Sequence, residues 1–194
     1  MINLDKCRII AAVHNMEEFE EALKSNVQII FALSTNIMNI STYVKMAHEK
    51  GKILFVHIDM TNGITKDSYG MGYIANTGVD GILSTRTNLI RLAKERGLKT
   101  IQRLFVIDAQ SIKTSVESAK IHKPDFIEIM PGVVPKSVVR FKESLNIPII
   151  TGGLIETKEE IKAAIEVGAA AVSTSKQELW YEFIGSEEKS TDEH

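Results

Sequence analysis

The sequence predicts a single-domain α/β protein built as a compact TIM-like (β/α)8 barrel. Eight short apolar segments rich in β-branched residues alternate with longer segments in which apolar residues recur at helical spacing. Such alternation favours one parallel sheet, and eight repeats are the number that closes it into a barrel. The chain has 194 residues, fewer than the roughly 250 typical of this fold, so we expect short loops and short or missing helices.

The expected elements follow one another in order along the chain. Strands are expected at residues 8–13, 28–33, 52–59, 81–84, 100–107, 125–130, 147–151 and 170–173. Helices are expected at residues 16–25, 37–50, 87–96, 110–121, 135–145, 158–167 and 177–183. Residues 61–73 are rich in Gly, Asn, Asp and Ser, and we expect a loop there with at most a short helix. This loop is either a lid over the barrel mouth or a plain surface connection.

Composition limits the environment and the partners of the protein. The net charge of −2 gives no global sign of nucleic-acid or membrane binding. No apolar run approaches the roughly 18 residues of a membrane span, and the first residues lack a signal-peptide pattern. The single Cys7 excludes an internal disulfide and favours a reducing compartment. We therefore expect a cytoplasmic protein with a barrel domain over residues 1–184 and a disordered acidic tail over residues 185–194.

Two neighbouring segments near the C-terminus predict a phosphate site. Gly152 and Gly153 follow one β-run, and Ser173, Thr174 and Ser175 end the next. Glycines and hydroxyls let an anion approach bare backbone N–H groups, and the macrodipole of a following helix favours negative charge. In a (β/α)8 barrel the loops after strands 7 and 8 are the frequent phosphate position. The sequence thus indicates a small phosphorylated ligand.

Three charged residues are expected among otherwise apolar strands. Glu128 and Arg103 lie in adjacent strands, where each is costly to bury unless paired, so we expect them to pair inside the barrel. That pair is either structural or binds the polar end of a ligand. Asp59 ends its strand before an irregular loop and is expected to contact ligand. No catalytic residue, cofactor or metal ion is expected.

Basic residues gather between Arg86 and Lys123. This segment carries nine basic and three acidic residues, a net charge of +6 against −8 for the remainder. Such a flank suits a polyanion such as RNA, although charge alone favours the plainer interpretation of a solvated face of two helices. The expected RNA-binding residues are Arg86, Arg91, Lys94, Arg96 and Lys99.

Five short segments together resemble one family, the bacterial glycerol-3-phosphate-responsive antiterminators, also called glycerol uptake operon antiterminator regulatory proteins. The segments are Phe55-Val-His-Ile-Asp59, Asp80-Gly-Ile-Leu-Ser84-Thr85, Gln102-Arg-Leu-Phe105, Ile127-Glu-Ile-Met-Pro-Gly132 and Thr151-Gly-Gly-Leu-Ile155. The resemblance implies a small barrel that binds glycerol 3-phosphate. It also implies binding to leader mRNA ahead of glycerol-utilisation genes, which prevents premature termination of transcription.

On this interpretation the phosphate lies against Gly152, Gly153, Thr174 and Ser175, and the two hydroxyls meet a carboxylate of Asp59 or Glu128. The rival hypothesis is a barrel enzyme that acts on a small phosphate ester, such as an isomerase, an aldolase or a phosphodiesterase. No matched acid–base pair or Schiff-base lysine is evident, which favours the regulator. The sequence leaves the oligomeric state open, a homo-oligomer included.

Overall fold

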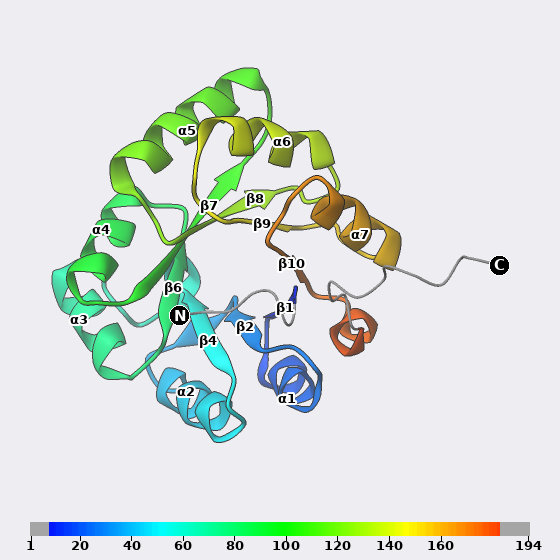
Figure 1. Ribbon diagram of the computed structural model, residues 1–194. Coiled ribbons are helices and arrows are strands. Elements are labelled where there is room, and N and C mark those ends of the chain that lie inside the picture. Colours follow the sequence, from blue (N-terminus) through cyan, green and yellow to red (C-terminus); the bar gives the residue numbers. More distant parts are fainter. Residues whose placement is uncertain (1–7, 183–194) are drawn as a thin grey trace.

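Eight parallel strands close into a barrel in the computed structural model, which describes residues 8–182. The strands pair in the order β1-β10-β9-β8-β7-β6-β4-β2, so the predicted (β/α)8 architecture is confirmed (Figure 1). Their bounds are β1 Ile9–Val13, β2 Ile29–Ala32, β4 Ile53–His57, β6 Gly81–Ser84, β7 Lys99–Phe105, β8 Phe126–Met130, β9 Ile149–Gly152 and β10 Ala171–Thr174. Because all strands are parallel, their C-terminal ends meet at one mouth.

Within residues 8–182, seven α-helices surround the barrel. They are α1 Met16–Lys24, α2 Ile40–Glu49, α3 Ser68–Asn76, α4 Thr87–Glu95, α5 Ala109–His122, α6 Pro135–Ser144 and α7 Lys158–Glu166. Figure 1 places α4 and α5 on the flank of the barrel away from α1 and α7. Side-chain caps fix several N-termini, as where Asn15 accepts a hydrogen bond from the Glu18 N–H and Asp108 accepts one from the Ser111 N–H. No helix among residues 8–182 is long and apolar enough to span a membrane.

Apolar side chains fill both sides of the sheet. One large cluster lies between the strands and the helices, and a second fills the barrel interior below the mouth. In the second cluster the rings of Phe31 and Phe55 meet edge to face at 5.8 Å. Alternation along each strand produces both layers, because successive side chains point to opposite faces. The interior is thus a packed core whose polar residues are confined to its upper end.

Three local predictions were wrong. Residues 61–73 are no plain loop: Thr61–Asn62 (β5) pairs with Thr35–Asn36 (β3), and α3 begins at Ser68 with Asp67 as its N-cap. Two glycines lower the helix propensity of this segment, yet Gly70 is needed because a Cβ there would lie 1.9 Å from the Thr65 carbonyl oxygen.

The other two errors concern where a strand ends and which type of helix forms. The strand expected over residues 52–59 ends at His57, and Ile58–Met60 forms a 3-10 turn (η1). The helix expected over residues 177–183 is a five-residue 3-10 segment, η2, Gln177–Tyr181. The tail predicted for residues 185–194 lies outside the described residues.

Candidate functional site

A cavity of about 230 Å³ opens at the barrel mouth. It lies beside the C-terminal ends of strands β7 to β10, β1 and β2. Five predicted site residues line it, and they are Arg103, Gly153, Ser173, Thr174 and Ser175. Further lining residues include His14, Met130, Leu154, Glu156 and Lys176. Asp59, Glu128 and Gly152 are not among the lining residues. The volume is below the roughly 300–1,000 Å³ of pockets that hold drug-sized ligands, so the cavity suits a small metabolite.

A buried polar triad forms the floor beneath this cavity. Glu128 on β8 is fully buried, and its two oxygens accept hydrogen bonds from Arg103 Nε at 2.6 Å and Ser173 Oγ at 2.6 Å. The predicted pairing of Arg103 with Glu128 is thereby confirmed. A carboxylate buried in an apolar interior requires such partners. Glu128 therefore holds the Arg103 guanidinium and the Ser173 hydroxyl at the cavity wall, where both line the space above it.

Gly152 makes this triad sterically feasible. It lies on β9, between the strand that carries Glu128 and the strand that carries Ser173. A Cβ at Gly152 would lie 2.0 Å from Ser173 Oγ and 2.9 Å from Glu128 Oε1. Real Cβ atoms do not approach other atoms so closely, so any side chain here displaces the Ser173–Glu128 hydrogen bond. The structure thus places Gly152 beneath the cavity and beside the triad.

The three hydroxyls at the C-terminal end of β10 have different surroundings. Thr174 Oγ1 donates to the Ile155 carbonyl at 2.7 Å and accepts from the Lys176 N–H at 3.1 Å, which ties the β9–α7 loop to the β10–η2 loop. Ser173 is committed to Glu128. Within residues 8–182, the hydroxyl and N–H of Ser175 have no hydrogen-bond partner, although Ser175 lines the cavity. Ser175 is therefore the hydroxyl that is available to a ligand.

The backbone after β9 turns in an unusual conformation. Gly153 and Leu154 have φ angles of 78° and 63°, in the left-handed region that non-glycine residues seldom adopt. Leu154 is 71% exposed at the cavity rim. This turn aligns the β9–α7 loop along the cavity wall, where four consecutive residues from Gly153 to Glu156 contribute to the lining.

Helix termini near the cavity bear on the macrodipole part of the phosphate prediction, which stays a prediction. The carboxylate of Glu160 accepts from the N–H groups of Glu156 and Thr157, just before α7. The element after β10 is only a short 3-10 segment, and no residue of α7 lines the cavity. An anion that contacts only the lining residues would therefore meet loop N–H groups and cationic side chains.

Among the described residues, four titratable side chains line the cavity: His14, Arg103, Glu156 and Lys176. Lys176 Nζ lies 3.6 Å from Glu156 Oε1 across the two loops. His14 contacts Glu18 at 3.3 Å. Lys176 and Glu156 were missed as site residues, although Lys176 directly follows the Ser-Thr-Ser run. No group of three or more metal-ligating side chains occurs among the described residues.

Asp59 lies on the β4–β6 side of the mouth. Its carboxylate accepts hydrogen bonds from Ser84 Oγ at 2.8 Å, the Thr85 N–H at 2.7 Å and Thr85 Oγ1 at 2.9 Å. His57 Nε2 is 3.5 Å from Asp59 Oδ2. Burial opposes ionisation, but the contact with His57 and the hydrogen bonds from Thr85 and Ser84 together hold the pKa of Asp59 well below its ordinary value. Asp59 thus anchors the loop that follows β6, and its contact with ligand stays a prediction.

The lowered pKa of Asp59 makes a testable contribution to stability. A carboxyl group whose pKa is depressed by folding stabilises the native state above its unfolded pKa of about 3.9, and this stabilisation is lost as the pH falls. We expect the unfolding free energy of the unaltered chain to fall below about pH 5 more steeply than that of Asp59→Asn. Urea titrations between pH 7 and pH 3 measure both slopes, and equal slopes would contradict the anchoring role.

Each of the five predicted RNA-binding residues has an intramolecular contact, and Arg86 lies at the mouth beside Asp59. Arg91 pairs with Glu95, Lys99 pairs with Asp125, and Arg86 Nε lies 3.9 Å from Asp59 Oδ1. Lys94 Nζ donates to the carbonyls of Lys123 and His122, and Arg96 Nη2 donates to the Ser68 carbonyl at 3.3 Å. Arg86, Lys94, Arg96 and Lys99 therefore join neighbouring segments, and Arg91 pairs within α4. The role of these residues in RNA binding stays a prediction.

Comparisons with known proteins agree on one family. The sequence profile described as "Glycerol-3-phosphate responsive antiterminator" matches residues 9–180. The structure is similar to that of the glycerol uptake operon antiterminator regulatory protein from Listeria monocytogenes, with 38% identity and a TM-score of 0.85 over 90% of this chain and 95% of that chain. A glycerol uptake operon antiterminator-related protein from Thermotoga maritima is similar at 29% identity and a TM-score of 0.79, over 90% and 98% of the two chains.

One curated relative is similar over most of its length. The uncharacterized protein YgcP of Escherichia coli (strain K12) is 34% identical over 173 residues, which are 89% of this chain and 91% of the relative. The family match spans nearly all of the described barrel, including the cavity and the buried triad beneath it. The chain belongs to the glycerol-3-phosphate responsive antiterminator family.

Proposed function

We propose that this chain is a transcription antiterminator that binds glycerol 3-phosphate in the mouth cavity and then binds leader mRNA of glycerol-utilisation genes. On this proposal, transcription no longer terminates prematurely in the leader once the protein has bound it. The observation that carries the ligand assignment is Arg103, a guanidinium held by a fully buried carboxylate at the wall of a small cavity. A fixed cation beside loops that expose backbone N–H groups suits a phosphate monoester.

The cavity lining supports one orientation of the ligand. We place the phosphate between the Gly153–Leu154 turn and Ser175, with Arg103 and Lys176 as the nearby cations. The hydroxyls of the glycerol end would then donate to Glu156, the carboxylate that lines the cavity. This differs from the expected contact with Asp59 or Glu128, because neither of those carboxylates is among the lining residues. Glu128 would contribute to ligand binding indirectly, by holding Arg103 and Ser173 in position.

The β9–α7 loop is the element that we expect to respond to the ligand. It supplies four consecutive lining residues, and Leu154 stands exposed at the rim in a left-handed conformation. Such backbone strain of about 1–3 kcal/mol persists only where the surroundings impose it, and it is typical of ligand clamps and switch regions. A ligand shifts a conformational equilibrium only when it binds one state better than the other. Contacts between the ligand and the β9–α7 loop would make the ligand bind one conformation of this loop better than the other.

The first test is ligand binding, measured by isothermal titration calorimetry. We expect glycerol 3-phosphate to bind the unaltered chain and glycerol to bind far more weakly. Ser175→Ala removes a hydroxyl that would face a charged phosphate, and we expect about ten- to hundred-fold weaker binding. Ser144→Ala, an exposed serine on α6, is the matched control and should bind normally. Equal affinities of the two variants would contradict the proposed phosphate position.

The second test addresses the RNA response. A labelled transcript of the leader is titrated with the protein, with and without saturating glycerol 3-phosphate. We expect the ligand to raise the affinity for the transcript, and we expect antitermination in a purified transcription assay to need both components. An affinity for RNA that does not change at saturating ligand would contradict the sensor mechanism.

A further inference from the structure

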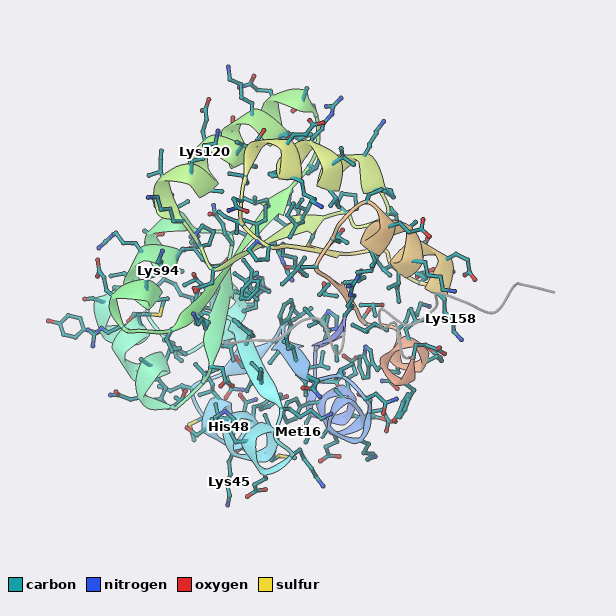
Figure 2. All side chains as sticks on the ribbon, viewed as in Figure 1. Met16, Lys45, His48, Lys94, Lys120 and Lys158 are labelled. Atoms are coloured by element: carbon teal, nitrogen blue, oxygen red, sulfur yellow. The ribbon has the colours of Figure 1, made fainter. Side chains whose placement is uncertain are left out.

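Charge is distributed unevenly around the barrel. The +6 segment from Arg86 to Lys123 forms α4, β7 and α5, on the flank away from α1 and α7 (Figure 1). Figure 2 shows Lys94 on α4 and Lys120 on α5 on this flank, whereas Lys45 on α2 and Lys158 on α7 lie elsewhere on the outer surface. Helix α1, by contrast, carries four glutamates against one lysine. A polyanion that approaches the molecule is therefore drawn to the α4–α5 flank.

Several cations on this flank remain available for a partner. Within residues 8–182, no hydrogen bond or ion pair engages the exposed ammonium groups of Lys113, Lys120 and Lys123 on α5 and at its end. Lys94 bonds to the carbonyls at the C-terminus of α5 and so joins the ends of α4 and α5. The flank is thus a continuous surface across both helices.

The fold brings part of α3, which carries an exposed tyrosine, against the end of α4. Arg96, at the end of α4, donates from Nη2 to the Ser68 carbonyl at the start of α3. A Cβ at Gly72 would lie 3.2 Å from Arg96 Nη1, so the guanidinium lies over this part of α3. Tyr69 directly follows Ser68 and is 87% exposed. Tyr69 and Arg96 are 27 positions apart in sequence, and the contact between α3 and α4 places them on neighbouring surfaces.

We propose that the α3–α4–α5 flank, which we call the RNA flank, binds a single-stranded segment of RNA. The RNA flank comprises Tyr69, Arg96, Lys94, Lys120 and Lys123. A base stacks on the Tyr69 ring, and the phosphates that follow contact Arg96 and the lysines of α4 and α5. An exposed ring beside a basic track is the arrangement by which proteins hold single strands. This inference rests on the proposed function and specifies where its RNA partner binds.

Charge also argues against a second copy of this chain as the occupant. In a twofold-symmetric dimer the same patch is present on both sides of the interface. Pairing two RNA flanks would bring their cations face to face, and like charges at an interface are unfavourable. An RNA strand supplies the opposite charge along the whole track, so it fits this surface better.

The test compares matched variants of the full chain by fluorescence anisotropy with a labelled leader transcript at several salt concentrations and saturating glycerol 3-phosphate. Tyr69→Ala should weaken binding about tenfold and leave the salt dependence unchanged, because stacking is not an ionic contact. Tyr69→Phe should bind normally. Lys120→Glu should weaken binding and lower the slope of log K against log salt by about 1 or more, whereas Lys45→Glu on α2 should bind nearly normally.

A check on each variant comes first, and three alternative outcomes are then distinguished. Each variant is first shown to bind glycerol 3-phosphate and to melt like the unaltered chain, so that loss of RNA binding reports on the RNA flank. If Tyr69→Ala and Lys120→Glu bind RNA normally while the unaltered chain also binds, the RNA flank is wrong and the proposed function stands. If the unaltered chain binds no leader RNA, both are overturned. If light scattering shows that Tyr69→Ala dissociates an oligomer without loss of RNA affinity, the surface is a self-association face and the proposal fails.

Discussion

Replacing Glu128 with alanine is expected to destabilise the fold by about 3–5 kcal/mol and to abolish binding of glycerol 3-phosphate. Glu128 is fully buried and is the only described side chain that pairs with the Arg103 guanidinium. Its removal leaves that guanidinium, 9% exposed, without a counter-charge, and it also leaves the Ser173 hydroxyl without its acceptor. Urea denaturation measures the loss of stability, and titration calorimetry at low temperature measures ligand binding.

A double variant separates the structural role of this pair from its role at the cavity. When both partners of a buried ion pair become apolar residues of similar size, stability is often retained. We therefore expect Arg103→Met with Glu128→Leu to recover most of the unfolding free energy and still fail to bind glycerol 3-phosphate. A stable double variant that binds the ligand normally would reduce Arg103 and Glu128 to a structural pair.

The second large effect is expected at Gly152. Gly152→Ala places a methyl group 2.0 Å from Ser173 Oγ, inside a closed barrel that cannot expand freely. Overpacking of a core and loss of the charged hydrogen bond to Glu128 together predict a cost of about 3 kcal/mol. We also expect ligand affinity to fall, because Ser173 moves at the cavity wall. Denaturation and calorimetry on the purified variant measure both effects.

The matched control removes the clashing atom. Gly152→Ala combined with Ser173→Ala eliminates the 2.0 Å contact, although the new methyl group still lies 2.9 Å from Glu128 Oε1. We expect the double variant to be more stable than Gly152→Ala alone. If Gly152→Ala were as stable as the unaltered chain, the close approach of β9 to the triad would be refuted.

Periodicity predicted the barrel correctly because each strand buries both faces and each helix buries one. Residues such as Ile127 and Ile129 flank Glu128 in an apolar run, and this pattern alone implied a paired buried charge. Arg103 was identified as the partner because strands adjacent in sequence are also adjacent in a (β/α)8 sheet, and Arg103 and Glu128 are register partners. Local sequence patterns therefore suffice to predict such a pair when strands that are neighbours in the chain are also neighbours in the sheet.

Prediction failed where tertiary contacts override local preference. The glycines of α3 indicated a loop, but Gly70 is required by its contact with Thr65, so the helix forms despite them. Gly152 and Gly153 were predicted to act together at a phosphate, yet one lies beneath the cavity and the other lines it. Gly152 ends β9 facing Ser173 and Glu128, whereas Gly153 already belongs to the left-handed turn that follows the strand.

The sequence by itself determined the barrel, the family resemblance, the buried Arg103–Glu128 pair and the C-terminal loops around the mouth. The barrel and the buried pair follow from hydrophobic periodicity and from the cost of burying an unpaired charge, which depend on residue type and spacing. The resemblance rests on the five short segments quoted above. Only the tertiary structure decided which side chains reach the cavity, which hydroxyls are already engaged, and that Arg96 binds the carbonyl of Ser68, the residue before Tyr69. Those features depend on side-chain direction and on helix packing between distant segments, and no local pattern encodes them.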